Sequence, residues 1–333
     1  MQLMRAGQDR VSLLHPRSGD GKTVASSATP YRVWVDDPAQ FTTDRIATLH
    51  HNFHDHPLMQ LPQLAQLARE LMASGQCRFM IRGASETSAF ESVLKARSPD
   101  RREVDEVFRH IEEPGSWVAL YNVETNPSYR AFLADVMSSA QSLLERKQPG
   151  IFKVSGYTFI SAPPSVTPFH IDRENNFWLQ VRGQKTISVW DHTDRDVVAA
   201  KDVEEFVLFG SLEHVRLEEA VRNRRHEFHA EPGDGVYFPS TSPHMTRCDT
   251  AWVKPGDGVC ISMAIVFYTE VTLRHARVHQ VNHLLRRLGI TPRSPGQSAL
   301  SDAVKAPFGH LAGKVRELRR GTDTLRPLPP GSY

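Results

Sequence analysis

The chain has 333 residues and a mass of 37.5 kDa, which is room for one large domain with helical additions or for two small domains. Its hydrophobic fraction of 40%, charged fraction of 23% and net charge of +2 at pH 7 are ordinary for a globular protein and indicate no partner by themselves. Three cysteines without a CxxC pair argue against a disulfide framework or a structural zinc site, and no run reaches the roughly 18 apolar residues that a membrane span needs.

Residues 1–30 are polar and rich in Gly and Ser, so we expect a poorly ordered lead-in. They lack a continuous apolar core ahead of a small-residue cleavage site, and therefore do not resemble a signal peptide. Because an odd number of cysteines also favours a reducing compartment, the sequence predicts a cytoplasmic protein that does not associate with membranes.

Residues 31–149 predict a mixed α/β region that packs on the domain after it. Apolar residues recur at helical spacing in three segments, and short apolar runs lie between them. The expected elements are helices over 61–72, 103–111 and 129–146, and strands over 77–83 and 117–123.

Residues 150–270 have a different pattern, in which short strand-like runs follow one another with Gly and Pro between them. The expected strands cover 152–160, 176–181, 185–190, 235–239 and 258–268. Many short strands with such turns favour a β-sandwich or barrel over a parallel α/β sheet.

Residues 271–333 return to a helical pattern, with one apolar stripe and a second, basic helix that ends near Arg320. The stripe consists of Val278, Val281, Leu285 and Leu288. This segment holds 11 Arg and Lys against 3 Asp and Glu, a surplus of 8 positive charges. It can form a dimerisation helix pair or a surface for an acidic partner or nucleic acid. We favour a homodimer, because no DNA-binding motif accompanies the charge.

Three residues in the predicted barrel have the types and spacing of a metal site. His170 and Asp172 are two apart, so on a strand both side chains would point to the same face. His244 follows 74 residues later, after a turn, a short strand and a second turn. One carboxylate with two imidazoles suits Fe(II) or Mn(II) better than a thiolate set would. An isolated His–Asp pair is more often an ordinary hydrogen bond, and the distal His244 is what favours the metal.

Lys185 lies 15 residues after His170, at the head of a mostly apolar strand. A lysine that faces a barrel interior is costly unless an anion pairs with it. The alternative, with Lys185 facing outward, stays open on position alone. Thr167 and Asn176 flank the metal motif and offer hydrogen bonds, or serve as turn and strand-end residues.

The pattern Thr-x2-His-x-Asp-x3-Asn-x8-Lys, with the distal His244, resembles the JmjC/cupin-like 2-oxoglutarate oxygenases over about residues 157–268. Within that family it is most similar to the branch of the asparaginyl hydroxylase that inhibits hypoxia-inducible factor and its bacterial cupin-like relatives. The resemblance implies a mainly β fold with α additions, namely a double-stranded β-helix (jelly-roll/cupin, JmjC-type) barrel over 150–270. It also implies an Fe(II)- and 2-oxoglutarate-dependent dioxygenase that hydroxylates a protein side chain, an amino acid or a small metabolite.

The resemblance also implies roles for single residues. His170, Asp172 and His244 would bind the iron, which takes the cosubstrate 2-oxoglutarate and dioxygen. Lys185 and Thr167 would hold the C5 carboxylate, with Asn176 beside the cosubstrate. Two more cosubstrate contacts are expected from Tyr121, on an earlier strand, and from Ser262, which stands where the close relative has Asn. Lys254, ten residues after His244, is a rival anchor for the carboxylate.

Two other functions fit a cupin-like barrel: a non-oxidative metal-dependent enzyme, and a non-catalytic ligand-binding or regulatory protein. Isomerase cupins usually carry His-x-His and a later Glu, whereas this chain has Asp172 in the second position. That difference favours the oxygenase, while the substrate itself is beyond the sequence.

Overall fold

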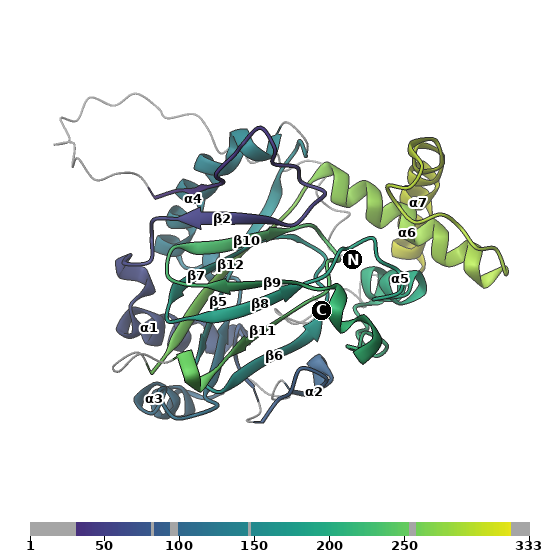
Figure 1. The fold of residues 1–333 in the computed structure, drawn as a ribbon. Helices are drawn as coiled ribbons and strands as arrows, with labels where there is room; N and C mark the ends of the chain where they lie inside the picture. The colour runs from purple at the N-terminus through teal and green to yellow at the C-terminus, as the bar shows by residue number, and fades with distance from the viewer. Residues whose placement is uncertain (1–30, 81–82, 94–98, 146–147, 253–257, 321–333) are drawn as a thin grey trace, which may run out of the picture.

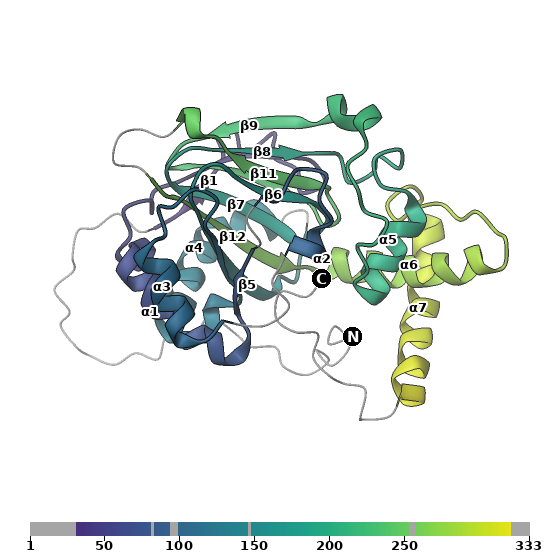
Figure 2. The same cartoon turned by 90° about the horizontal axis from the view of Figure 1, so that it is seen from below.

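The computed structural model describes residues 31–320 apart from 81–82, 94–98, 146–147 and 253–257, so the expected lead-in over 1–30 lies outside the described residues. Two antiparallel sheets face each other (Figures 1 and 2). The larger sheet has the order β1 (Val33–Trp34), β2 (Ala47–His51), β10 (Asp234–Phe238), β7 (Asn175–Arg182), β12 (Cys260–Tyr268), β5 (Phe152–Ser161), β4 (Trp117–Leu120) and β3 (Cys77–Phe79). The smaller sheet has the order β6 (Ser165–His170), β11 (His244–Cys248), β8 (Lys185–Val189) and β9 (His226–Ala230).

The chain passes repeatedly between the two sheets. From β5 to β12 successive strands alternate between the larger and the smaller sheet, except that β8 and β9 pair as neighbours in the smaller one. This winding gives a flattened double-stranded β-helix. No hydrogen-bonded ladder joins the two sheets within the described strands, so they form no closed barrel. The prediction of a mainly β fold with α additions is confirmed.

Strand alternation divides the core into two layers, because successive side chains point to opposite faces of a sheet. On β7, Phe177 and Leu179 belong to the apolar layer between the larger sheet and its covering helices. Trp178, between them, packs instead with Ile187 and Phe238 in the space between the sheets. The inward residues of β7, β8 and β10 therefore surround the interior in which a site can form.

The N-terminal region supplies the helices that cover the larger sheet, α1 (Leu61–Leu71), α3 (Arg101–Arg109) and α4 (Pro127–Glu145), with a short α2 (Phe90–Val93) near the smaller sheet (Figure 2). All three helices predicted there exist, and Asp100 with Glu103 forms a capping box at the start of α3. The strands predicted over 77–83 and 117–123 end earlier, at Phe79 and Leu120. Both join the larger sheet, and the domain boundaries remain a prediction.

Three helices stand together at one end of the sheets (Figure 1): α5 (Ala200–Phe209), α6 (Glu270–Arg287) and α7 (Ala299–Arg320). The predicted stripe on α6 is only partly buried: Val278 is fully covered, but Leu288 lies just past the last turn and is 76% exposed. Short 3-10 turns occur at Pro57–Met59, Met72–Ser74, Val123–Thr125, Glu219–Arg224 and Thr250–Trp252. Among the described helices, none combines the length and the apolar character that crossing a bilayer requires.

Helices α6 and α7 cross very closely at Gly309. A Cβ atom at this position would come within 2.1 Å of the Arg277 backbone oxygen, so only glycine fits. We expect Gly309→Val to detach α7 from α6, since overpacking typically costs about 1–3 kcal/mol. Limited proteolysis should cut α7 faster in this variant, whereas Ala303→Val, at an exposed position of the same helix, should behave like the wild type. Equal cleavage rates in the two variants would contradict the close crossing.

Candidate metal centre

His170, Asp172 and His244 come together between the sheets at the end of β6. His170 is the last residue of β6, and His244, the first of β11, lies directly opposite it in the ladder. The ligand-type atoms of the three side chains all lie within 4.8 Å of one another, with His244 Nε2 3.4 Å from Asp172 Oδ2. Each residue is about 5% exposed or less. The structure thus brings together the three residues that the sequence singles out as metal ligands.

The route by which Asp172 reaches the cluster differs from the prediction. The same-face argument placed both ligands on one strand, but β6 ends at His170 and Asp172 lies in the loop beyond it. The ladder with β11 stops at the His170–His244 pair, after which the Thr241 backbone N–H donates to the Asp172 carbonyl at 2.8 Å. Asp172 is therefore held near the imidazoles by this backbone hydrogen bond from Thr241, and not by strand alternation.

Backbone carbonyls fix the orientation of both imidazoles. Nδ1 of His170 lies 2.7 Å from the Pro168 oxygen, and Nδ1 of His244 lies 3.0 Å from the Ser242 oxygen. If each Nδ1 carries the proton and donates it, Nε2 is left as the metal-binding lone pair. The sequence did not identify these partners. It also missed Phe90 of α2, whose ring stacks on His170 with centroids 4.2 Å apart.

Burial sets the charges of the cluster. It lowers the pKa of His170 well below its usual range and that of His244 to about 4, so both imidazoles are neutral near pH 7. Burial also raises the pKa of Asp172 to about 7, against a lowering by its hydrogen bond from Asn176. Asp172 Oδ1 is buried without a hydrogen-bond partner among the described residues. A divalent cation fits this set, because it would accept two neutral nitrogens and compensate the carboxylate.

Lys185 faces the interior at the far end of β8. It is 3% exposed, and within the described part of the chain its ammonium makes no hydrogen bond or ion pair. Burial lowers its pKa, while the thiols of Cys260 and Cys248 raise it. Val189, four positions after Lys185 on β8, lies opposite His244. A buried cation without a partner, on the same strand face as the ligands, fits an anion placed between it and the metal.

The other residues predicted to contact the cosubstrate are buried in the same interior, and the described ones already have partners there. Thr167 accepts a hydrogen bond from Trp117 Nε1 at 3.3 Å, and Asn176 Nδ2 donates weakly to Asp172 Oδ2 at 3.5 Å. Tyr121 is fully buried with its ring 5.1 Å from that of Tyr157. Ser262, also buried, already donates to Gln180 Oε1 at 2.7 Å. Lys254 lies outside the described residues.

Comparison with known proteins agrees with this geometry. Residues 131–264 match the family model described as JmjC domain, whereas no curated protein matches the sequence. Among solved structures, the ribosomal oxygenase YcfD from Escherichia coli is similar at 15% identity, with a TM-score of 0.46 over 87% of this chain and 70% of that one. Its complex with cobalt and 2-oxoglutarate gives 15% identity and a TM-score of 0.45, covering 88% of this chain and 69% of that one.

The matched segment contains all three clustered residues and Lys185, and it ends in the middle of β12. The double-stranded β-helix, the cluster of two histidines and one aspartate, and the buried lysine agree with that match. Residues 131–264 therefore match a JmjC domain, and the buried cluster within them fits the metal site of an iron(II)- and 2-oxoglutarate-dependent oxygenase.

Proposed function

We propose that this chain is an iron(II)- and 2-oxoglutarate-dependent oxygenase that acts as a hydroxylase, with His170, Asp172 and His244 as its iron ligands. The observation that carries the proposal is the buried cluster of three ligand-type side chains, all within 4.8 Å, supplied by the end of β6, the loop after it and the start of β11. Three protein ligands leave room on a six-coordinate ion for a chelating keto acid and for dioxygen. When bound, iron and 2-oxoglutarate supply the oxidative decarboxylation to succinate that drives insertion of one oxygen atom into a C–H bond.

The chain's own residues position and protect this chemistry. The carbonyls of Pro168 and Ser242 hold the imidazole rings in one orientation, which keeps their Nε2 atoms converging. Lys185 offers its ammonium to the C5 carboxylate of 2-oxoglutarate, with Thr167 beside it. The Phe90 ring stacks on the His170 ring, and the ring centroids of Phe238 and His244 lie 4.6 Å apart. These two aromatic rings limit the access of water to the ligands.

Succinate formation under 18O-labelled dioxygen tests the proposal. The full chain with Fe(II) and 2-oxoglutarate should form succinate slowly without any substrate and faster with one, and the substrate should gain one labelled oxygen atom. His244→Ala should form none, because only two ligands remain. Succinate formation at equal rates in the wild type and His244→Ala would remove the metal assignment, and a labelled succinate without a labelled product would count against a hydroxylase.

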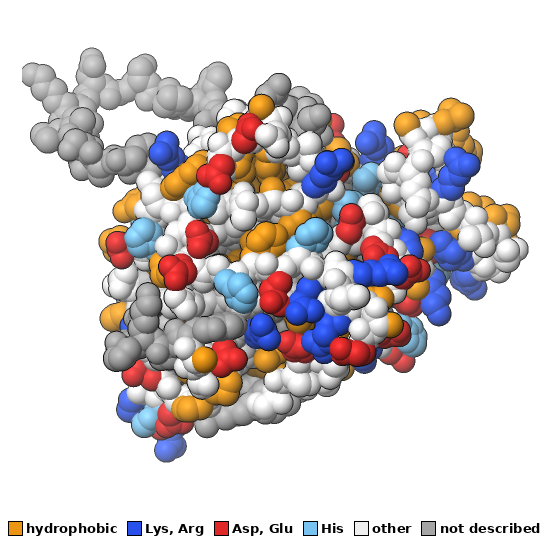
Figure 3. Space-filling view, in the orientation of Figure 1, with side chains coloured by type: hydrophobic (Ala, Val, Ile, Leu, Met, Phe, Trp, Pro, Cys, Tyr) orange, Lys and Arg blue, Asp and Glu red, His pale blue; other side chains and the backbone are white. Residues whose placement is uncertain are grey.

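We further propose that the chain forms a homodimer through its C-terminal helices. All of the exposed large apolar side chains among the described residues lie on α5, α6, α7 or the α6–α7 connection. Figure 3 shows apolar side chains gathered over α7. Four of them follow one face of α7: Leu300, Val304, Phe308 and Leu311, which are 55–78% exposed. A second copy would cover this face, because an apolar stripe of that kind is rarely left in water.

Phe308→Glu together with Leu311→Glu is expected to halve the particle mass. The two carboxylates would have to be buried in the interface, at a cost that a dimer of two helices cannot offset. Light scattering on the full chain measures the mass, and Ala303→Glu, beside the stripe on the same helix, is the control. A wild-type chain that is already monomeric would contradict the proposal.

We also propose that the protein is cytoplasmic, because an odd number of cysteines favours a reducing compartment.

A further inference from the structure

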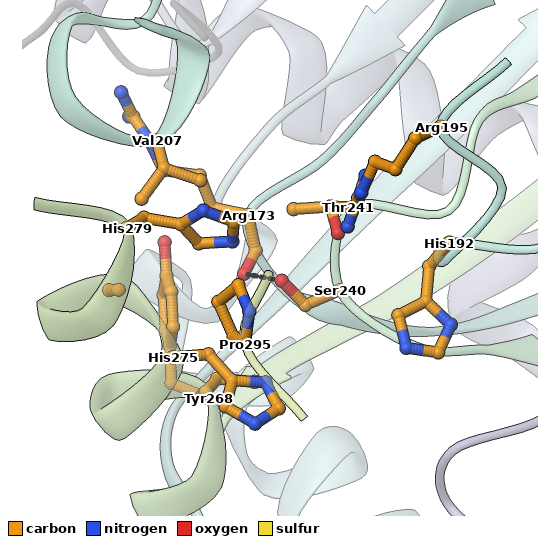
Figure 4. Close-up of a pocket in the computed structure, with 12 residues that line it drawn as sticks. Arg173, His192, Arg195, Val207, Ser240, Thr241, Tyr268, His275, His279 and Pro295 are labelled. Carbon is orange, nitrogen blue, oxygen red and sulfur yellow. Dashed lines mark hydrogen bonds between the residues drawn. The ribbon is translucent and has the colours of Figure 1, made fainter. Parts of the chain in front are cut away.

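A small cavity lies beside the metal cluster, between the loops that carry the ligands and helix α6 (Figure 4). Arg173 comes from the loop after β6, Arg195 from the loop after β8, Thr241 from the turn before β11, and His279 from α6. The centres of water molecules can occupy about 40 Å³ of it. Because one water needs about 10–15 Å³ by this measure, the cavity has room for about three water molecules, and so for the oxygen atoms of a small oxyanion.

The charge of the walls is positive. No carboxylate lines the cavity within the described residues, whereas two guanidinium groups do. Among the described residues, the Nε atoms of Arg173 and Arg195 are both buried without a hydrogen-bond acceptor, while Nη2 of Arg173 donates to the Phe206 carbonyl at 2.7 Å. Three acids raise the pKa of Arg195 by their charge, and each has another partner: Glu204 pairs with Arg286 at 3.0 Å, Asp194 pairs with Arg224 at 3.0 Å, and Asp191 accepts from Thr193 at 2.7 Å. Two partly buried guanidinium groups without an anion are costly, so an anion at this place would stabilise the fold.

Polar groups that point into the same space complete the walls. His279 is 5% exposed, and its Nδ1 has no hydrogen-bond partner among the described residues. His275 lies one helical turn earlier on the same face of α6, and Figure 4 shows both rings opposite Thr241 and Arg195. Imidazole and hydroxyl groups next to planar guanidinium groups are the usual donors to carboxylate and phosphate oxygens.

The cavity shares a wall with the metal cluster. Arg173 directly follows the ligand Asp172 in the chain. Thr241 donates its backbone N–H to the Asp172 carbonyl at 2.8 Å, and Ser240 Oγ donates to the Arg173 carbonyl at 2.7 Å. An anion in the cavity would therefore lie against Arg173 and Thr241, the residues that adjoin the ligand Asp172.

We propose that this cavity is an oxyanion subsite that holds a carboxylate or phosphate group of the substrate while its C–H bond is presented to the metal. The inference rests on the proposed function and narrows the substrate to an acidic one. It assigns Arg195 and Arg173 as the charged anchors, with His279 and Thr241 as further donors.

Phosphorus relaxation locates such an anion relative to the metal. The full chain is loaded with Mn(II), saturated with 2-oxoglutarate so that its chelate fills two of the three open metal positions, and titrated with inorganic phosphate. We expect faster 31P relaxation than in the Zn(II)-loaded chain, since the phosphate would lie near the paramagnetic ion. Acetate, followed by calorimetry, is the carboxylate probe. Absence of binding by both probes in the wild type would overturn the inference.

Two substitutions of Arg195 and one control separate this subsite from the metal. Arg195→Gln should weaken phosphate binding about 10-fold or more, and Arg195→Lys, which keeps the charge but loses the planar fork, should weaken it less. Arg287→Gln, at an exposed position of α6, should bind as the wild type does. Unchanged 31P relaxation in both Arg195 variants would show that phosphate binds at the metal and would overturn the inference.

The wild type distinguishes this inference from the proposed function. A chain that converts 2-oxoglutarate but binds neither probe refutes the subsite alone. A chain that binds phosphate near Mn(II) but never forms succinate refutes the hydroxylase, and with it the substrate role of the subsite.

Discussion

Asp172→Ala is expected to abolish 2-oxoglutarate turnover, with succinate formation at least 100-fold below that of the wild type. The carboxylate is the only anionic group in the cluster, and its Oδ1 has no partner among the described residues. Removing it leaves two neutral imidazoles, which hold a divalent ion weakly. Succinate measured by NMR, with and without Fe(II), reports the loss. His170→Ala should behave in the same way.

The same variant should change thermal stability in a way that a structural role for Asp172 would not. In the wild type, Mn(II) at 100 times its Kd should add about 2.7 kcal/mol, a rise in Tm of roughly 5–10 °C for a domain of this size. Asp172→Ala should show no such rise. Without metal it should unfold no earlier than the wild type, because a poorly compensated buried carboxylate has been removed. Asp135→Ala, at an exposed position of α4, should keep the metal-dependent rise, and a large rise in Asp172→Ala would contradict the assignment.

Lys185→Met is expected to raise the KM for 2-oxoglutarate far more than Lys254→Ala does. Losing one partner of a buried, hydrogen-bonded charge pair costs about 2–5 kcal/mol, which corresponds to roughly 30- to 3000-fold in affinity. Methionine keeps most of the side-chain volume and removes only the ammonium. Steady-state succinate formation over a range of 2-oxoglutarate concentrations measures the effect.

The chain without cosubstrate provides an internal check on the Lys185 substitution. Lys185 is buried and its pKa is lowered by that burial, so Lys185→Met should unfold at an equal or higher temperature than the wild type when no 2-oxoglutarate is present. A lower unfolding temperature would indicate that the ammonium is paired in the empty protein. If Lys254→Ala raises the KM for 2-oxoglutarate more than Lys185→Met does, then Lys254 binds the C5 carboxylate instead of Lys185.

The strands that the sequence predicts are those whose runs are mainly apolar. They are β5, β7, β8, β10 and β12, and their limits are close to those predicted. The runs of β9 (His226–Ala230) and β11 (His244–Cys248) instead place ionisable residues among few apolar ones. Such strands form because their neighbours in the smaller sheet pair with them, and this contribution is not contained in the local sequence.

The metal ligands could be predicted because both segments that carry them have recognisable sequence patterns. His170 and His244 meet through one antiparallel pair, and two segments found separately therefore converge. The path of Asp172 was not predictable, since it depends on a hydrogen bond from Thr241, 69 residues away. Phe90 carries no sequence signal at all, because its contact with His170 depends on where a four-residue helix packs.

The cavity of Arg173, Arg195 and His279 shows the same limit. Each residue alone is an ordinary polar residue in a loop or helix, and no spacing connects them. Only the packing of α6 against the ligand loops brings them together, so a charged subsite of this kind comes from tertiary structure.

The anaerobic visible spectrum of the full chain with Fe(II) and 2-oxoglutarate tests the central claim most directly. The weak metal-to-ligand charge-transfer band of a chelated keto acid should appear only when both are added, should weaken at limiting 2-oxoglutarate in Lys185→Met, and should be absent from His244→Ala. A wild-type chain that binds Fe(II) and 2-oxoglutarate without developing this band, or a His244→Ala chain that keeps it, would contradict a metal centre built from these three side chains.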